Sequence, residues 1–226
     1  MARHVDAHDG DGEGLDEAGW KARLESGARQ LGVGLDASQL DTLWRYAQLL
    51  RERNAHVNLT AIVAPEGILT LHMLDSLSVA PHLGEARRVI DVGTGGGFPG
   101  IPLAVAFPER QFTLIDGTQK KIRFVAESIA ALDIRNATAI AARAESYPGE
   151  RRFDVAVARA VGSLAELLRD AARLLAPRGR LLAMKGKLAE DELRGVPRGW
   201  RAEVTPLRVP GLDAERHLVT LSRRTA

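Results

Sequence analysis

The stretch "RVIDVGTGGGFPGIP", Arg88 to Pro102, decides the fold of this chain. It begins as a short apolar run, passes through a glycine-rich turn and ends with two prolines. Gly95, Gly97 and Gly100 have the spacing G-x-G-x-x-G, which is typical of a dinucleotide-binding turn between a strand and a helix. The stretch therefore predicts a ligand-binding turn at the carboxyl end of a first parallel strand.

Short apolar runs alternate with helical segments after this turn. The predicted strands are 88–92, 111–116, 137–141, 153–158 and 179–185, and the predicted helices are 99–106, 118–131, 163–175 and 188–194. This alternation predicts parallel βαβ units in a doubly wound α/β sheet. The last two apolar segments, "WRAEVTPLRV" and "ERHLVTLSRR", have no long helix between them and predict an antiparallel pair of C-terminal strands.

The residues before the first strand have helical character. Asp36 precedes apolar residues at helical spacing, which predicts a helix start, and Pro65 is typical of the first position of another helix. Residues 17–84 are therefore expected to form an N-terminal helical extension of the domain at 85–226, with which it makes one compact unit. Residues 1–16 are rich in Asp, Gly and His without periodicity and predict a disordered acidic tail.

Composition excludes several kinds of chemistry. The 226 residues include no cysteine, which excludes disulfides, a thiolate zinc site and a cysteine nucleophile. We expect no metal site, and no apolar run reaches the ~18 residues of a membrane span, so a cytoplasmic protein is expected. The net charge of +2 combines −4 in residues 1–36 with +6 in the remainder, and a basic body permits a nucleic-acid partner.

The residues around the glycine turn argue against a phosphate ligand. A pyrophosphate needs free backbone N–H groups and no nearby anion. Pro99 and Pro102 have no N–H to donate, and Asp91 stands at the end of the strand. These features favour a cationic ligand such as S-adenosylmethionine, whose ammonium Asp91 could meet. Asp116, which ends the second strand 21 residues after Gly95, suits the ribose hydroxyls of either cofactor.

Further candidates follow the later strands. Ala144 and Glu145 follow the third strand, where an adenine edge would lie, and Arg159 ends the fourth strand beside the predicted ligand site. Lys185 ends the fifth strand, where an RNA backbone could approach. Arg159 and Lys185 are the two candidate catalytic residues. Other basic residues in this half are Lys120, Lys121, Arg123, Arg151, Arg152 and Lys187.

His72 and Asp75 could form a functional pair, although core or capping roles suit them equally well.

If the enzyme transfers a methyl group, the sequence narrows the acceptor. Without cysteine it cannot form the covalent adduct that methylation of pyrimidine C5 usually requires. The loop Ala158–Val161 lacks the Asn/Asp-Pro-Pro-aromatic motif that receives an exocyclic amine. An acceptor that is nucleophilic in its neutral form, such as guanine N7, remains possible, because it needs alignment rather than a general base.

The sequence resembles the bacterial small-subunit ribosomal RNA guanine-N7 methyltransferase family, also called glucose-inhibited division protein B. The resemblance covers about Leu40 to Arg223. Its motifs are "NLTAI" (58–62), "HMLDSL" (72–77), "DVGTGGGFPGIP" (91–102), "LIDGTQKKIRFV" (114–125), "RAE" (143–145), "ARAV" (158–161), "KGK" (185–187) and "ERHLV" (215–219).

The resemblance implies a class I, Rossmann-like methyltransferase fold and a guanine of 16S rRNA, in the 530 loop, as the substrate. We expect the enzyme to be a monomer that acts on 16S rRNA or the small ribosomal subunit. The residues that the resemblance implies at the S-adenosylmethionine site are Asp91, Gly93, Gly95, Phe98, Asp116, Ala144, Glu145 and Arg159. Gly117 departs from the family, which often has serine there.

Two other functions are compatible with parts of this pattern. An NAD-linked oxidoreductase could use the same glycine spacing. A non-catalytic module that binds RNA or the ribosome could retain a methyltransferase fold without activity.

Overall fold

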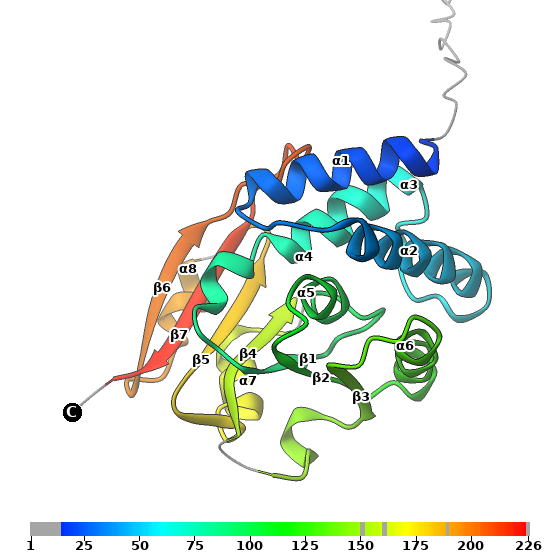
Figure 1. Ribbon diagram of the computed structural model, residues 1–226. Coiled ribbons are helices and arrows are strands. Elements are labelled where there is room, and N and C mark those ends of the chain that lie inside the picture. Colours follow the sequence, from blue (N-terminus) through cyan, green and yellow to red (C-terminus); the bar gives the residue numbers. More distant parts are fainter. Residues whose placement is uncertain (1–14, 150–151, 160–161, 189, 225–226) are drawn as a thin grey trace, which may run out of the picture.

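The computed structural model describes residues 15–149, 152–159, 162–188 and 190–224 of the chain and contains a seven-stranded sheet (Figure 1). The strand order is β3-β2-β1-β4-β5-β7-β6. The strands are β1 (Arg88–Val92), β2 (Gln111–Asp116), β3 (Ala137–Ala141), β4 (Phe153–Arg159), β5 (Leu175–Lys185), β6 (Trp200–Pro206) and β7 (His217–Arg223). The first five are parallel and β7 runs antiparallel between β5 and β6, so the predicted α/β fold is confirmed.

The topology reverses its direction between β1 and β4. The chain proceeds from β1 to β2 and β3 on one side, then returns to place β4 and β5 on the other. In open parallel sheets ligands bind at such a reversal, beyond the carboxyl ends of the strands. The glycine turn follows β1 directly and therefore lies at this point.

The segment between α7 and β5 differs from its prediction. Helix α7 (Leu164–Ala171) ends before the predicted 175, and β5 begins already at Leu175. Leu175 pairs with Phe153 and Arg180 with Val155, so the residues between them bulge out of the ladder. Pro177 and Gly179 lie in this bulge. Because these two residue types are typical of turns, the sequence pattern predicted a turn where the strand begins.

Two long helices begin the described chain, α1 (Glu17–Gln30) and α2 (Ala37–Val57). A capping box between Asp36 and Gln39 starts α2, as the sequence predicted. Residues 1–14 of the predicted tail lie outside the described residues. The last two residues of the predicted tail, Leu15 and Asp16, are ordered parts of the fold. The Leu15 N–H donates to Glu66, and the Asp16 side chain caps α1.

A continuous helical segment follows from Pro65 to Leu77. It consists of α3 (Pro65–Gly67), which Pro65 begins as predicted, then η1 (Ile68–Leu74) and α4 (Asp75–Leu77). The middle part is a π-helix, which no sequence pattern predicted. A short 3₁₀ turn, η2 (Ala80–Leu83), then leads into β1.

The remaining helices connect the strands. They are α5 (Gly100–Ala106), α6 (Gln119–Ala131), η3 (Ala144–Ser146), α7, and α8 (Glu190–Arg194).

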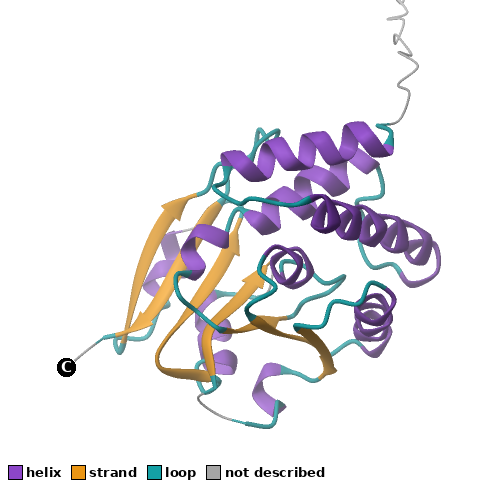
Figure 2. Ribbon diagram, in the orientation of Figure 1, coloured by secondary structure: helices purple, strands orange, loops and turns teal. Residues whose placement is uncertain are grey.

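The N-terminal helices and one face of the sheet share a core (Figure 2). Trp20 of α1, Leu43 of α2 and Leu77 of α4 belong to the same buried cluster as Leu114 of β2. A second cluster on the other face includes Leu167 of α7. Within the described ranges, no helix combines the length and the apolar character needed to cross a bilayer.

Candidate functional site

The glycine turn after β1 satisfies most of its own backbone N–H groups. Those of Gly93 and Thr94 donate to the Ile115 carbonyl at 2.9 and 3.0 Å. Those of Gly97 and Phe98 donate to the Thr94 carbonyl, both at 2.9 Å. A phosphate needs free N–H donors, and these groups are already used within the protein. The geometry therefore supports the prediction that the turn is a poor pyrophosphate site.

Asp91 lies beneath this turn and is fully buried. Its Oδ2 accepts hydrogen bonds from the Thr94 hydroxyl at 2.5 Å and from the Gly100 N–H at 2.8 Å. Burial raises the pKa of Asp91 to about 6 in spite of these bonds. Through these two bonds Asp91 holds the turn in place, and an interaction between its charge and a ligand ammonium stays a prediction.

Asp116 holds the other side of the turn. One carboxylate oxygen accepts from the Gly95 N–H at 2.9 Å and the other from the Thr118 N–H at 2.7 Å. The residue is only half-buried, so both oxygens keep lone pairs for another donor. Asp116 therefore connects the turn after β1 to the loop after β2 and still faces outward.

A cavity of about 700 Å³ opens at the carboxyl ends of β1, β2 and β3. Four of the predicted site residues line it: Gly93, Asp116, Ala144 and Glu145. Its volume lies within the range of small-molecule sites, and the half-exposed carboxylate of Asp116 offers acceptors to a ligand hydroxyl. These residues thus fit a nucleoside with a free ribose.

Arg173 was missed by the sequence reasoning and supports the wall of this cavity. Its Nη2 donates to the carbonyls of Ala144 at 2.9 Å and Tyr147 at 2.5 Å. Arg173 lies between α7 and β5 and outside the motifs of the sequence, so no sequence signal distinguished it.

The other four predicted residues, which are Asp91, Gly95, Phe98 and Arg159, are not among those that line the cavity. Gly95 lies in the turn, where its N–H is bound by Asp116. Phe98 is buried, and its ring stacks on His72 with centroids 4.4 Å apart. The guanidinium of Arg159 lies 5.1 Å from the centre of the Phe98 ring. Phe98 and Arg159 therefore belong to a second group of side chains.

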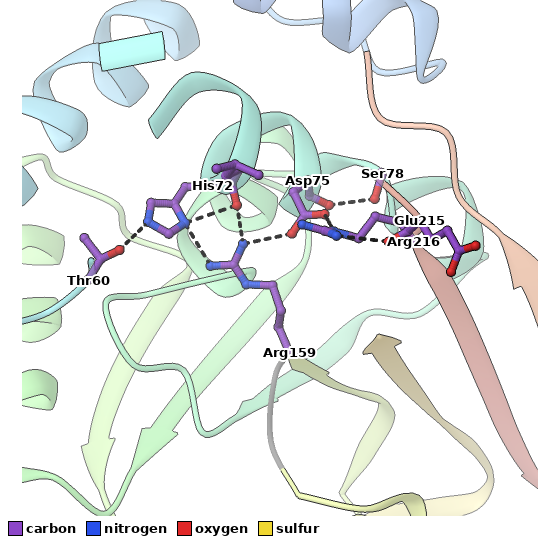
Figure 3. A network of polar contacts seen from close by, with 8 residues as sticks. Thr60, His72, Asp75, Ser78, Arg159, Glu215 and Arg216 are labelled. Atoms are coloured by element: carbon purple, nitrogen blue, oxygen red, sulfur yellow. Dashed lines mark hydrogen bonds and ion pairs between the residues drawn. The ribbon is translucent and has the colours of Figure 1, made fainter. Parts of the chain in front are cut away.

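This second group centres on Arg159 at the end of β4 (Figure 3). Its Nη1 donates to Oδ2 of Asp75 at 3.0 Å and to the Leu71 carbonyl at 2.8 Å. Its Nη2 lies 3.2 Å from Nδ1 of His72, and Nε2 of His72 lies 2.8 Å from the Thr60 hydroxyl. Nδ1 of His72 also lies 3.2 Å from the Leu71 carbonyl, so this nitrogen faces both a donor and an acceptor. Residues from the helical extension therefore surround the arginine that the sequence placed at the sheet.

His72 is held neutral in this group. Burial, and then the positive charge of Arg159, lower the pKa of His72 to about 3. The sequence left its role open between a functional pair with Asp75 and a core position. The structure instead has both residues as partners of Arg159.

Arg216, in the "ERHLV" motif, completes the group and was not singled out from the sequence. Its Nε donates to Oδ1 of Asp75 at 2.9 Å, so each oxygen of this buried carboxylate binds one arginine. A second cavity, of about 420 Å³, adjoins the group, and His72, Asp75, Arg159, Lys185 and Arg216 are among its lining residues. It lies at the carboxyl ends of β4 and β5.

Lys185 is bound within the protein. Its Nζ donates to the Gly162 carbonyl at 2.6 Å and to Glu192 at 3.1 Å, and only 12% of its side chain is exposed. Among the other basic candidates, the exposed residues are Lys120, Arg123, Arg152 and Lys187, whereas Lys121 is half-buried and Arg151 lies outside the described residues.

Comparison with known proteins agrees with this geometry. The model of the family described as rRNA small subunit methyltransferase G matches residues 39–219. The chain is 48% identical over 198 residues to the ribosomal RNA small subunit methyltransferase G of Methylococcus capsulatus, covering 88% of this chain and 96% of that protein. Its identity to the protein of the same name from Cupriavidus necator is 42%, over 93% of this chain and 98% of that protein.

Solved structures show the same fold at low sequence identity. A SAM-dependent methyltransferase from Aquifex aeolicus matches with a TM-score of 0.53 and 16% identity, over 67% of this chain and 92% of that chain. The O-methyltransferase TomG from Streptomyces achromogenes, in complex with SAM, matches with a TM-score of 0.52 and 19% identity, over 91% of this chain and 99% of that chain.

Proposed function

Because this chain belongs to the rRNA small subunit methyltransferase G family, we propose that it transfers the methyl group of S-adenosylmethionine to N7 of a guanine in 16S rRNA. The family establishes the class of enzyme. The nucleotide, which we place in the 530 loop, and the atom are our proposal.

The cavity over β1, β2 and β3 is the observation that carries this proposal. Gly93, Asp116, Ala144 and Glu145 would hold the cofactor, which supplies an electrophilic methyl group when bound. Asp116 would accept hydrogen bonds from the ribose hydroxyls, because it is half-exposed at this cavity. Gly95 would act through its bond to Asp116.

Three further cofactor residues of this proposal, Asp91, Phe98 and Arg159, would act without lining this cavity. Asp91 would act by holding the turn through its bonds to the Thr94 hydroxyl and the Gly100 N–H. Phe98 and Arg159 would form the boundary between the two cavities, since the guanidinium lies over the ring.

Methylation at guanine N7 suits the residues of this site. The N7 lone pair is available in the neutral base, so the protein must align the acceptor rather than remove a proton. The pKa of His72 is lowered to about 3, so its ring is neutral. Both ring nitrogens contact protein groups, Arg159 and Thr60, which agrees with a reaction that requires no general base. Basic residues such as Lys187, which is exposed beside β5, would contact the RNA backbone.

The NAD-linked alternative is disfavoured by the glycine turn. The N–H groups that a pyrophosphate would use are bound to the Ile115 and Thr94 carbonyls. Calorimetry with S-adenosylhomocysteine and with NADH distinguishes the two functions. We expect binding of the first and none of the second, and the reverse would overturn the assignment. Binding of S-adenosylhomocysteine would also count against a non-catalytic module.

Methyl transfer to ribosomal RNA is the decisive test. Small subunits and free 16S rRNA from a strain that lacks the gene are incubated with the protein and tritiated S-adenosylmethionine. We expect label in the 16S rRNA and a modified guanine at one mapped nucleotide. Label at another atom of the base would overturn the N7 assignment, and no label in either RNA would overturn the proposed function.

A further inference from the structure

We propose that the cavity at the carboxyl ends of β4 and β5 binds the target base and that Arg216 selects guanine over adenine by donating a hydrogen bond to O6. This inference rests on the proposed function and adds to it the recognition of the base. It concerns the second cavity, of about 420 Å³, and not the cofactor cavity.

The second cavity lies beside the predicted cofactor site. Arg159 ends β4, which pairs with β1 and thus stands next to the strand that leads into the glycine turn. Arg159 is opposite Met184 in the ladder between β4 and β5, so both line the cavity from one edge of the sheet. A base in this cavity would therefore adjoin the place where the methyl group is expected.

The walls of the cavity suit a planar base. Ile62 and Leu71 line it from the helical extension, and Met184 lines it from β5. Apolar side chains of this kind can contact the faces of an aromatic ring, while polar groups read its edge. The extension thus contributes part of the binding site as well as part of the core.

The polar groups of the cavity are mainly hydrogen-bond donors. Arg159, Lys185 and Arg216 are cationic, and Asp75 has both carboxylate oxygens bound to arginines. The Hoogsteen edge of guanine presents two acceptors, O6 and N7, whereas adenine presents the N6 amino donor in place of O6. A donor-rich cavity therefore matches guanine and opposes adenine.

Arg216 is the arginine of this cavity with a terminal guanidinium nitrogen, Nη2, that has no partner among the described residues. Both terminal nitrogens of Arg159 have partners, Nη1 in Leu71 and Asp75 and Nη2 in His72, and Nζ of Lys185 is bound to Gly162 and Glu192.

The known bonds of Arg216 use only two of its three nitrogens. They run from Nε to Asp75 and from Nη1 to the Glu215 carbonyl. In the described part of the chain, Nη2 has no protein partner, and 23% of the side chain is exposed. Figure 3 shows Arg216 beside Asp75. Asp75 is a positioning residue, because its carboxylate accepts from Nε of Arg216 and orients the guanidinium.

The test compares bases at one position of the substrate. Ligated 16S rRNA carries guanine, inosine or adenine at the mapped nucleotide, and kcat/KM for methyl transfer is measured for the wild type, Arg216→Gln and Arg216→Lys. Arg201→Gln is the matched control, because Arg201 is an exposed arginine on the outer strand β6. Thermal unfolding and S-adenosylhomocysteine binding show whether each variant remains folded.

We expect the wild type to use guanine and inosine almost equally, because both have O6, and to disfavour adenine. Arg216→Gln should reduce the ratio of guanine to adenine at least about tenfold, since one donor to O6 is lost, and Arg216→Lys should retain part of it. Adenine is intrinsically less reactive than guanine, but this difference is the same for every variant. It therefore cancels when the ratio of guanine to adenine transfer in one variant is compared with that in another.

Two results would overturn the inference and leave the proposed function intact. One is an equal loss of guanine and adenine transfer in Arg216→Gln, which would assign Arg216 to the RNA backbone. The other is an unchanged ratio in a variant that still binds S-adenosylhomocysteine. Failure of the wild type to methylate the guanine substrate would instead reject the proposed function itself.

Discussion

The guanidinium of Arg159 and the carboxylate of Asp75 form an ion pair at 3.0 Å that joins the end of β4 to helix α4. Only 17% of the arginine side chain and 4% of the aspartate side chain are exposed. Asp75 also pairs with Arg216 near β7, so one carboxylate connects three distant segments of the chain. The helical extension is thereby attached to the sheet by charge as well as by apolar packing.

Asp75→Asn should destabilise the protein by about 3 kcal/mol. The substitution leaves two arginines beside a neutral side chain, and removing one partner of a buried pair is costly. Urea unfolding measures the loss. Asp133→Asn, which breaks an exposed pair with Arg135, is the control and should cost much less stability than Asp75→Asn. Equal effects of the two substitutions would show that the Asp75 network does not stabilise the fold.

His72→Gln should reduce the loss of stability at low pH. The pKa of His72 is about 3 in the folded protein and about 6.5 when unfolded, so the unfolded state binds the extra proton between these values. His72 therefore makes the wild type less stable as the pH falls through this range, and glutamine removes this contribution.

Urea midpoints at about pH 7 and about pH 4.5 measure this effect. The midpoint should fall less in His72→Gln than in the wild type, whereas the exposed His56→Gln should leave the difference unchanged. Parallel pH dependence of His72→Gln and the wild type would contradict the prediction.

Asp91→Asn should show the opposite dependence on pH. The pKa of Asp91 is raised from 3.8 to about 6, so between these values the folded state binds the proton more tightly than the unfolded state. This contribution to wild-type stability is present below about pH 4 and is lost as the pH rises through 6. The variant should therefore gain stability relative to the wild type between about pH 4 and 7, as measured by urea unfolding.

Asp133→Asn serves as a control for Asp91→Asn. Hydrogen bonding by Arg135 lowers the pKa of Asp133 below its usual value of 3.8, so the stability of that variant relative to the wild type should change only below about pH 4 and stay constant between about pH 4 and 7. A relative stability of Asp91→Asn that is independent of pH would show that Asp91 is not desolvated as the structure indicates.

Gly97→Ala should destabilise the turn by about 2–4 kcal/mol. Gly97 has φ +89°, and an added Cβ would contact the Tyr46 hydroxyl and lie 2.8 Å from Ile101. Thermal unfolding compares this variant with Gly34→Ala, where nothing lies within 4 Å of an added Cβ. Similar melting temperatures for the two variants would argue against a tightly packed turn.

Asp116→Asn should weaken binding of S-adenosylhomocysteine at least about tenfold, because one of its two backbone N–H partners would face an amide NH₂. Calorimetry measures the affinity. Asp154→Asn is a matched control, since Asp154 also accepts two backbone N–H groups, from Arg87 and Arg88, but lies at the amino end of the sheet. An equal loss of affinity in both variants would show a general effect on the fold.

Regular features of the chain were predictable from local pattern. The bounds of β1, β2 and β3 agree with the predicted runs, because alternating strands and helices leave strong apolar periodicity. The start of β5 was wrong because Pro177 and Gly179 occupy a bulge within the strand. The π-helix at Ile68–Leu74 has no distinguishing residue pattern and could not be predicted.

The sequence by itself determined the parallel sheet, the position of the glycine turn and the bias of that turn against phosphate. These depend on residues close together in the chain, such as Asp91, Pro99 and Gly100. Only the tertiary structure decided that Asp91 is buried and that Asp75 joins Arg159 to Arg216. Burial and the choice of ion-pair partner depend on which distant segments pack together, and residues 75, 159 and 216 meet only when the extension folds against the sheet.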